Sequence, residues 1–249
     1  MNMSGGVLSS NAKKDDLIDV IVTRPAAQSR AFSKDLRAFA QARDVEARIL
    51  MAPVMEIVPR PNHDEGPAPS GVIFTSEHGV RYAPPVTYGV PAFCVGARTA
   101  DQARKAGHVI DHVALTAEDL ISARRGALPA GRVLHVCGAH HRGDIAEHLS
   151  QGATEVTRHI VYDQQQVALS PPILDRLNAA NAVVVALFSP RSAELFMKQG
   201  PYRAPLSFAV MSEAVQLSVE RFGAYPCTVA ETPTRAHMLE AVLAAGKMG

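Results

Sequence analysis

The amino-acid sequence predicts an α/β protein made of two similar domains, each with a parallel sheet covered by helices. Short, almost wholly apolar runs alternate with amphipathic helical patterns along the chain. Such buried strands are typical of parallel sheets with helices on both faces. One set of segments also occurs twice, about 114 residues apart. A period of this length is far longer than a solenoid repeat and indicates two copies of one domain.

Apolar runs predict the strands, and capped amphipathic runs predict the helices. The first strand, 17–22, precedes a helix whose apolar face carries Phe32, Leu36 and Phe39 at i, i+4 and i+7. Another helix, 116–125, begins at Thr116, a favoured N-cap residue. The same signals predict the remaining strands at 47–53, 71–76, 92–96, 131–138, 154–163, 182–189, 206–212 and 227–232, and the remaining helices at 99–107, 140–152, 171–180, 192–200, 213–223 and 234–246.

The repeat and two connecting segments predict how the domains are divided. IFTSEHGV aligns with ALFSPRSA, which places Ser76 on Ser189, and a second alignment places Thr23 on Cys137. The proline-rich segment 53–70 favours extended backbone, and 157–166 is the second connection. Because the chain crosses twice, one domain is expected to be inserted into the other. The first predicted domain is discontinuous and consists of 1–53 plus 164–249, with 1–16 as a disordered tail. The second, inserted domain is 58–157. The linkers between them are predicted at about 53–58 and 157–164.

Composition excludes several classes of protein. A formal net charge of +1 and the absence of Trp argue against a nucleic-acid partner. The purest apolar run, 182–188, is far shorter than the roughly 20 residues that cross a membrane. Three scattered cysteines and an N-terminus without an apolar signal segment predict a cytoplasmic protein without a disulfide framework.

Four histidines lie in one region without a metal-binding pattern. His141 and His148 are seven residues apart, whereas His135 lies inside a predicted strand and His140 adjoins His141. No cysteine or carboxylate stands at ligand spacing, so we predict no metal ion. Cys137 has no nucleophile partner at recognisable spacing and is expected to be a small buried residue. The segment VCGAHHRG matches no phosphate-binding motif, which disfavours a nucleotide-dependent enzyme.

Polar turns follow the predicted strands, where open α/β sheets bind their ligands. These turns contain VTRP (22–25), FTS (74–76) and VGARTA (95–100), and HIVYD (159–163), FS (188–189) and PT (233–234) follow along the chain. In this order and spacing the motifs resemble the uroporphyrinogen-III synthase family over residues 18–245. The resemblance implies two flavodoxin-like domains, a two-stranded linker and a substrate cleft between the domains.

The family resemblance also implies an activity. Members dehydrate and cyclise hydroxymethylbilane to uroporphyrinogen III with inversion of ring D, a step of tetrapyrrole and heme biosynthesis. The implied enzyme is a lyase without cofactor or metal, a monomer, and a transient partner of the preceding pathway enzyme. The alternative is a two-lobed small-molecule binding or sensor protein that does not convert its ligand.

The implied substrate is a linear tetrapyrrole with eight carboxylates. Arginine binds carboxylates in bidentate fashion, and helix N-termini offer free N–H donors. The substrate-binding residues implied are Arg24, Pro25, Thr75, Ser76, Arg98, Thr99, Gly138, Arg142, Ser189, Pro190, Ser192, Ser212 and Thr234. Alternatively, the hydroxyls are ordinary helix caps and the arginines are solvated. The sequence departs from the family pattern in two places. Cys137-Gly138 stands where Arg-Gly is expected, and Arg142 is the candidate substitute for that arginine. The turn MSEA of the second copy lacks the glycine found in VGAR of the first.

The resemblance implies one catalytic residue, Tyr162 of HIVYD. Loss of hydroxide from a hydroxymethylpyrrole is helped by a proton donor near the leaving oxygen. A tyrosine with an ordinary pKa near 10 stays protonated at pH 7. The alternative role for Tyr162 is packing within the linker.

Overall fold

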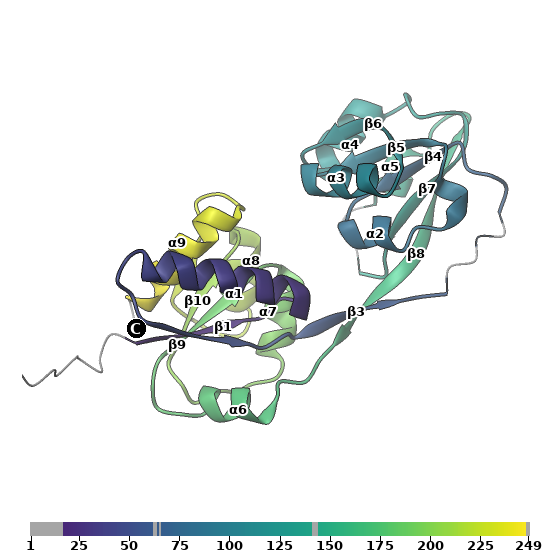
Figure 1. Ribbon diagram of the computed structural model, residues 1–249. Helices are drawn as coiled ribbons and strands as arrows, with labels where there is room; N and C mark the ends of the chain where they lie inside the picture. The colour runs from purple at the N-terminus through teal and green to yellow at the C-terminus, as the bar shows by residue number, and fades with distance from the viewer. Residues whose placement is uncertain (1–16, 62–63, 65, 141–143, 248–249) are drawn as a thin grey trace, which may run out of the picture. The chain divides into compact units, whose positions relative to one another are not determined.

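A computed structural model describes residues 17–61, 64, 66–140 and 144–247 of the chain. It divides into unit 1, Met1–Glu56 with Gln166–Gly249, and unit 2, Ile57–Gln165. Each unit is an α/β body with a predominantly parallel sheet (Figure 1). This confirms the predicted α/β class with parallel sheets. The expected tail 1–16, His141 and Arg142 lie outside the described residues.

Unit 1 has a five-stranded sheet in the order β11-β10-β9-β1-β2, with every neighbouring pair parallel. In Figure 1, purple β1 lies beside green β9, so segments distant in sequence share one sheet. The strands are β1 (Ile18–Val22), β2 (Ala47–Met51), β9 (Val183–Leu187), β10 (Leu206–Val210) and β11 (Cys227–Val229). The helices are α1 (Ala26–Gln41), α6 (Pro171–Leu177), α7 (Pro190–Met197), α8 (Glu213–Glu220) and α9 (Arg235–Gly246).

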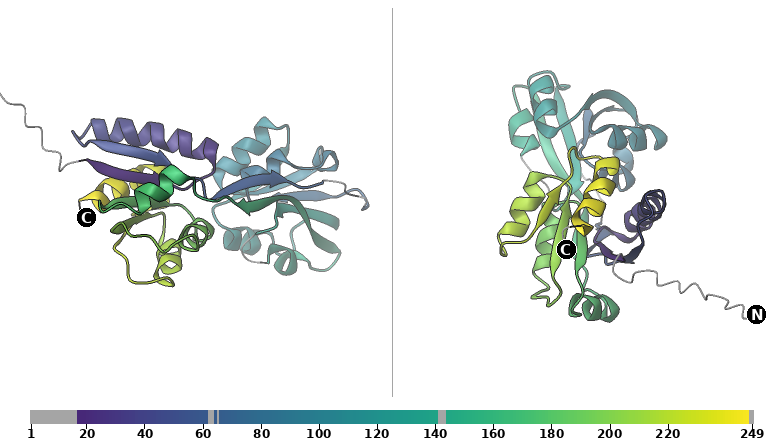
Figure 2. Two further views of the ribbon diagram at one scale, coloured as in Figure 1. Left: turned by 90° about the horizontal axis from the view of Figure 1, so that it is seen from below. Right: turned by 90° about the vertical axis from the view of Figure 1, so that its left-hand side faces the viewer.

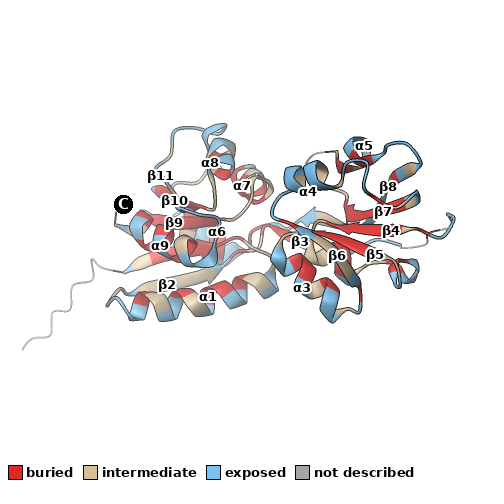
Figure 3. Cartoon of the chain, turned by 90° about the horizontal axis from the view of Figure 1, so that it is seen from above, coloured by how far each residue is buried: buried red, intermediate tan, exposed pale blue. Residues whose placement is uncertain are grey.

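Helices cover both faces of this sheet. Successive residues of a strand point to opposite faces, and in β1 Val20 packs into the core beneath α1 and α9 while Ile21 packs into the core beneath α6, α7 and α8. Figure 2 shows α1 lying over β1 and β2. Both faces of the central strands must therefore be apolar, which explains their continuous apolar runs. Edge strand β2 is only partly buried, as its tan colour in Figure 3 shows.

Unit 2 is built around a six-stranded sheet in the order β3-β8-β7-β4-β5-β6. Its strands are β3 (Met55–Pro59), β4 (Gly71–Phe74), β5 (Pro91–Val95), β6 (Val109–Ala114), β7 (Gly131–Gly138) and β8 (Thr154–Gln166). Its helices are α2 (Glu77–Arg81), the 3-10 turn Pro85–Thr87, α3 (Ala97–Lys105), α4 (Ala117–Arg124) and α5 (Ile145–Leu149). Helices α2 and α3 contribute to one core, and α4 and α5 to the other.

The two sheets share one strand order. When β8, β7, β4, β5 and β6 are placed on β2, β1, β9, β10 and β11, the order is the same in both units. In unit 1 this is the flavodoxin-like order, with a reversal between β1 and β9. In unit 2 the equivalent reversal lies between β7 and β4. The sequence alignment of Ser76 with Ser189 pairs the ends of β4 and β9, in agreement with this topology.

Strands β3 and β8 are neighbours where the chain passes between the units. The Arg60 N–H donates to the Val161 carbonyl at 2.9 Å, and the Val167 N–H donates to the Val54 carbonyl at 2.9 Å. The segment 157–166 predicted as the second linker is part of the 13-residue strand β8.

Several short or weakly patterned elements of the described chain are not predicted by the sequence patterns. Strand β6 is an edge strand in which exposed residues alternate with residues that are at least partly buried, so it lacks an apolar run. Helix α2 has five residues, too few to show helical periodicity. Strand β3 lies among prolines. The helix expected over 140–152 is described only as the short α5, which Asp144 caps. No helix in the described part of the chain has the length and apolar character to cross a membrane.

Candidate functional site

The predicted site residues gather at the carboxyl ends of the strands in each unit. In such sheets ligands bind where the strand order reverses. That position lies between β1 and β9 in unit 1 and between β7 and β4 in unit 2. Helices α1, α7 and α2 begin directly after β1, β9 and β4, so each reversal also carries helix N-termini.

In unit 2, Tyr162 and Ser76 meet at this edge. Tyr162 lies on β8, and its side chain is buried at 4% exposure. Its hydroxyl is 3.0 Å from Ser76 Oγ. Ser76 is the N-cap of α2, and its Oγ accepts a hydrogen bond from the Gly79 N–H at 2.9 Å. Both hydroxyls therefore belong to one hydrogen-bonded pair at the strand ends.

Gly138 provides the space for the Tyr162 ring. The two residues are partners in the pairing of β7 with β8, next to an irregularity between Cys137 and Gly138. A Cβ atom added at Gly138 would lie 2.5 Å from Cε2 of Tyr162. This distance is far below van der Waals contact, so only glycine fits here without a shift of the ring.

The surroundings of Tyr162 keep its hydroxyl protonated. Burial raises the pKa of Tyr162 above its ordinary value, and the hydrogen bond between Tyr162 and Ser76 offsets this only in part. The His78 and Tyr82 rings lie with their centroids 5.6 and 6.4 Å from the Tyr162 ring. At neutral pH the site therefore holds a phenol that can donate a proton, within an aromatic cluster.

Thr75 and Thr99 differ from the expected helix caps. The Thr75 hydroxyl lies 3.2 Å from Nε2 of His135, a buried residue of β7. His135 is thus a core residue in contact with the strand end. Thr99 is buried in the first turn of α3, and the N-cap of that helix is Gly96, at φ 84°. Arg98 is exposed and pairs with Glu77 at 2.9 Å.

Two charged residues at this edge were missed by sequence reasoning. Asp163 follows Tyr162 on β8 and forms an ion pair with Arg60 at 3.2 Å, and His140 Nε2 lies 3.7 Å from its carboxylate. The backbone N–H of Gln164 and the Arg60 side chain both lower the pKa of Asp163. Arg60 lies just beyond β3, which had no strand signal, so its approach to β8 could not be read from spacing.

In unit 1, the ends of β1 and β9 also meet. The Arg24 guanidinium lies 4.7 Å from the centroid of the Phe188 ring. Pro25 is the N-cap of α1, and Pro190 is in the first turn of α7. Ser189 caps α7 in a reciprocal capping box with Ser192.

Two further predicted residues are N-caps of unit 1 helices with different hydrogen bonding. Thr234 caps α9 and accepts a hydrogen bond from the His237 N–H at 3.4 Å. Ser212 is the N-cap of α8, yet its side chain makes no capping hydrogen bond. The Ser212 hydroxyl is therefore the better placed of the two to bind a ligand.

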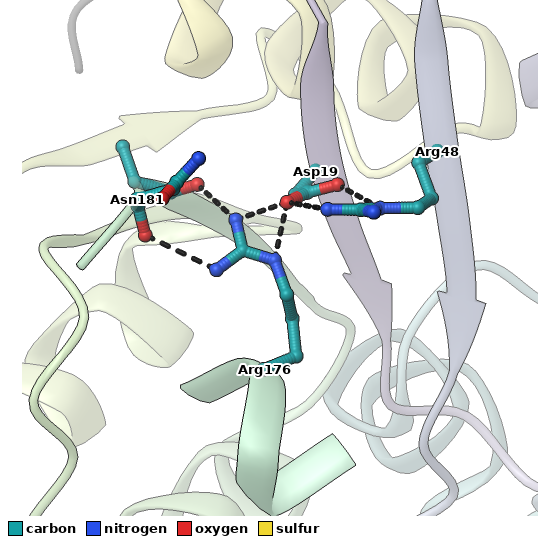
Figure 4. Close-up of polar contacts among 5 residues, drawn as sticks. Asp19, Arg48, Arg176 and Asn181 are labelled. Atoms are coloured by element: carbon teal, nitrogen blue, oxygen red, sulfur yellow. Dashed lines mark hydrogen bonds and ion pairs between the residues drawn. The ribbon is translucent and has the colours of Figure 1, made fainter. Parts of the chain in front are cut away.

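The opposite, amino edge of the unit 1 sheet carries a second polar cluster. Asp19 of β1 accepts hydrogen bonds from Arg48 of β2 at 2.5 and 2.6 Å and from Arg176 of α6 (Figure 4). Burial by itself raises the pKa of Asp19, but the two arginines outweigh it and hold the pKa below its ordinary value. These residues line a pocket of about 760 Å³. The cluster lies at the end of the strands opposite to the predicted site residues.

The described residues offer no metal centre or activated thiol. They contain no group of three or more His, Cys, Asp or Glu that could hold a metal ion. Burial raises the pKa of the Cys94 and Cys137 thiols to about 11. Both cysteines are therefore protonated at neutral pH and poor nucleophiles.

Comparison with known proteins gives one consistent result. A family model described as uroporphyrinogen-III synthase HemD matches residues 37–240. A solved uroporphyrinogen-III synthetase from Helicobacter pylori has 14% identity and a TM-score of 0.63, covering 91% of this chain and 99% of that chain. A mutant uroporphyrinogen III synthase from Thermus thermophilus has 15% identity and a TM-score of 0.53, covering 93% and 100%. At these identities the likeness shows the fold. No curated protein matches the sequence.

Proposed function

This chain belongs to the uroporphyrinogen-III synthase family. We propose that it dehydrates and cyclises hydroxymethylbilane to uroporphyrinogen III as a cofactor-independent lyase. The observation that carries the proposal is the buried phenol of Tyr162, paired with Ser76 at the strand ends of unit 2.

Tyr162 is proposed to give its proton to the leaving hydroxymethyl oxygen. The C–O bond breaks, its electron pair stays with the oxygen, and water departs. Electron density from the pyrrole nitrogen leaves an azafulvene cation on the substrate, and Tyr162 becomes a phenolate. Ring closure then releases one proton from the attacked pyrrole, which restores the phenol. Proton transfer from a positioned acid contributes about 10²–10⁴-fold to a rate.

The substrate carboxylates are proposed to bind at the strand-end turns. Arg24 in unit 1 and Arg98 in unit 2 lie at these turns, together with the N-termini of α7 and α8. Arg98 is paired with Glu77 in an exposed position, so exchanging that partner for a substrate carboxylate costs little. With a net charge of +1, attraction of an octa-acid depends on this local arrangement rather than on an overall field.

We expect the ring D inversion to follow from how the bilane is oriented when bound, because orientation decides which atoms can react. We also propose that the protein is a cytoplasmic monomer that binds the preceding enzyme of the pathway transiently. The contact between Arg142 and substrate stays a prediction, as does the cleft between the domains.

One assay separates the enzyme from the binding alternative. The purified chain is incubated with freshly made hydroxymethylbilane, and the uroporphyrin isomers are resolved after oxidation. We expect the type III isomer to replace the type I product of spontaneous closure. Heat-denatured protein serves as the control and should give type I only. Binding of the bilane by the native chain with only type I product would refute the enzyme proposal.

A further inference from the structure

We propose that Ser76 acts through Tyr162, as a positioning residue that stabilises the phenolate formed during proton transfer, rather than as a direct substrate contact. This inference rests on the proposed function, since it assumes that Tyr162 is the acid. It assigns a different role to Ser76 from the substrate contact that the family motif implies.

The hydrogen bonds of Ser76 favour this role. A serine hydroxyl has one proton to donate and two lone pairs. The Gly79 N–H already donates to Ser76 Oγ at 2.9 Å, which leaves the Ser76 proton available. The Tyr162 hydroxyl, 3.0 Å away, is in reach of that proton. When Ser76 donates to the phenol oxygen, the phenol proton is left to point at a substrate.

The pair responds to proton transfer in only one way. In the resting state either hydroxyl can be the donor, because both carry a proton. After Tyr162 has given up its proton, the phenolate can only accept, so Ser76 must donate. A hydrogen bond to an ionised oxygen is stronger than one between neutral groups. Ser76 therefore stabilises the transition state more than the ground state, which is the condition for raising kcat.

Burial of Tyr162 increases the effect of this hydrogen bond on the stability of the phenolate. Tyr162 is 4% exposed, so water has little access to a phenolate on its ring. Desolvation opposes ionisation of Tyr162, and the Ser76 hydrogen bond opposes that effect. Without the Ser76 hydroxyl, the phenolate would have neither this hydrogen bond nor ready access to water, so the pKa of Tyr162 should rise.

Comparison of the two copies of the domain indicates that the contact between Ser76 and Tyr162 does not follow from helix capping alone. Ser189 occupies the matching N-cap of unit 1 with nearly the same backbone, φ −156° and ψ 154° against φ −155° and ψ 152° for Ser76. The Ser189 hydroxyl donates to Ser192 Oγ at 3.2 Å. The capping box itself is formed by the backbone N–H groups of Ser192 and Ser189, which donate to Ser189 Oγ at 3.1 Å and to Ser192 Oγ at 3.0 Å. Helix α2 has no such box, and the Ser76 hydroxyl is directed to Tyr162 instead.

The test is a double-mutant cycle on turnover. We expect Ser76→Ala to lower kcat roughly tenfold, the rate equivalent of one hydrogen bond, with KM changed less than about twofold. Ser76→Thr keeps the hydroxyl and should restore most of kcat. In a Tyr162→Phe background, Ser76→Ala should cause almost no further loss. A tyrosinate absorbance titration, with Tyr162→Phe subtracted, should show a higher pKa for Tyr162 in Ser76→Ala.

Loss of the α2 cap needs its own control. Thr116 caps α4 and accepts a hydrogen bond from the Asp119 N–H at 3.1 Å, outside the proposed site. Thr116→Ala should reduce thermal stability as Ser76→Ala does and leave kcat unchanged. A similar fall in kcat in both variants would show that capping, not the tyrosine contact, explains the effect.

The outcomes separate this inference from the proposed function. If Ser76→Ala raises KM at constant kcat, or if its effect multiplies with that of Tyr162→Phe, Ser76 acts independently and the inference fails while Tyr162 remains the acid. If Tyr162→Phe keeps wild-type turnover, the assigned acid is wrong and the inference fails with it.

Discussion

Asp19 and Arg176 lie 157 residues apart in the sequence and form a buried ion pair that joins the two chain segments of unit 1. Arg48 binds the same carboxylate from the neighbouring strand, and Arg176 also donates to the carbonyls of Asn181 and Ala182 at 3.3 and 3.0 Å (Figure 4). One carboxylate thus holds two strands and a helix together at the amino edge of the sheet.

Asp19→Asn should destabilise the protein in a pH-dependent way. Removing the charge leaves Arg176, 11% exposed, without its counter-ion, which costs about 3 kcal/mol of unfolding free energy near pH 7. The pKa of Asp19 is lower in the folded than in the unfolded chain, so its contribution is present above about pH 4 and is lost as pH falls through the folded-state pKa.

Urea unfolding between pH 7 and pH 3 measures this difference. The gap between wild type and Asp19→Asn should be constant down to about pH 5 and close at lower pH. Asp101→Asn, which breaks an exposed pair with Arg104, is the matched control and should cost less than about 0.5 kcal/mol. A gap that does not narrow in acid would contradict the role of the Asp19 charge.

Gly138→Ala should displace the Tyr162 ring. The added Cβ would lie 2.5 Å from that ring, and such overpacking costs about 1–3 kcal/mol. We expect kcat to fall at least about tenfold, because the phenol moves away from Ser76. Thermal unfolding and steady-state kinetics measure the two effects. Wild-type kcat in a folded Gly138→Ala protein would show that the ring position does not matter.

Tyr162→Phe should lower turnover and keep the product isomer. The substitution preserves the ring and its packing, so stability should change by no more than about 1 kcal/mol, the worth of the hydrogen bond to Ser76. Loss of the acid should reduce kcat by about 10² or less, because water can partly replace the phenol. Isomer analysis of the residual product should still give type III. Undiminished turnover would identify Tyr162 as a packing residue.

Ser212 and Ser189 form a matched pair of helix caps. Ser189 is engaged in a capping box, whereas the Ser212 side chain makes no capping hydrogen bond. We expect Ser189→Ala to cost about 1 kcal/mol of stability. Ser212→Ala should leave stability unchanged and raise KM several-fold, since a free hydroxyl contributes only when substrate is bound. The reverse pattern would remove Ser212 from the proposed substrate contacts.

Cys137→Ala should retain activity. The thiol is buried with a pKa of about 11, so it is neither ionised nor accessible as a nucleophile. We expect turnover within about twofold of wild type and a stability loss of about 1 kcal/mol from the small cavity. Loss of turnover beyond a hundredfold in a stable Cys137→Ala protein would instead point to covalent catalysis.

The fold class, and the sheet edges at which the site residues gather, could be predicted from the amino-acid sequence without coordinates. Buried parallel strands need apolar side chains on both faces, so runs such as 182–188 are visible without a structure. The carboxyl ends of parallel strands share one edge, so Arg24, Thr75 and Ser189 could be assigned to such edges from the order of elements alone. Elements without a strong local period, β6 and α2, were not predictable in this way.

Which of these residues are in contact depends on the three-dimensional packing of the chain. Tyr162 and Ser76 are 86 residues apart, and their contact depends on β8 lying beside β7 and on the missing side chain at Gly138. Asp19 is a single polar residue in an apolar strand. Its role as the ion-pair partner of Arg176 in α6 can be recognised only in the folded structure. Periodicity reports which face of an element is buried, whereas a hydrogen bond between distant segments depends on register and packing that no local pattern encodes.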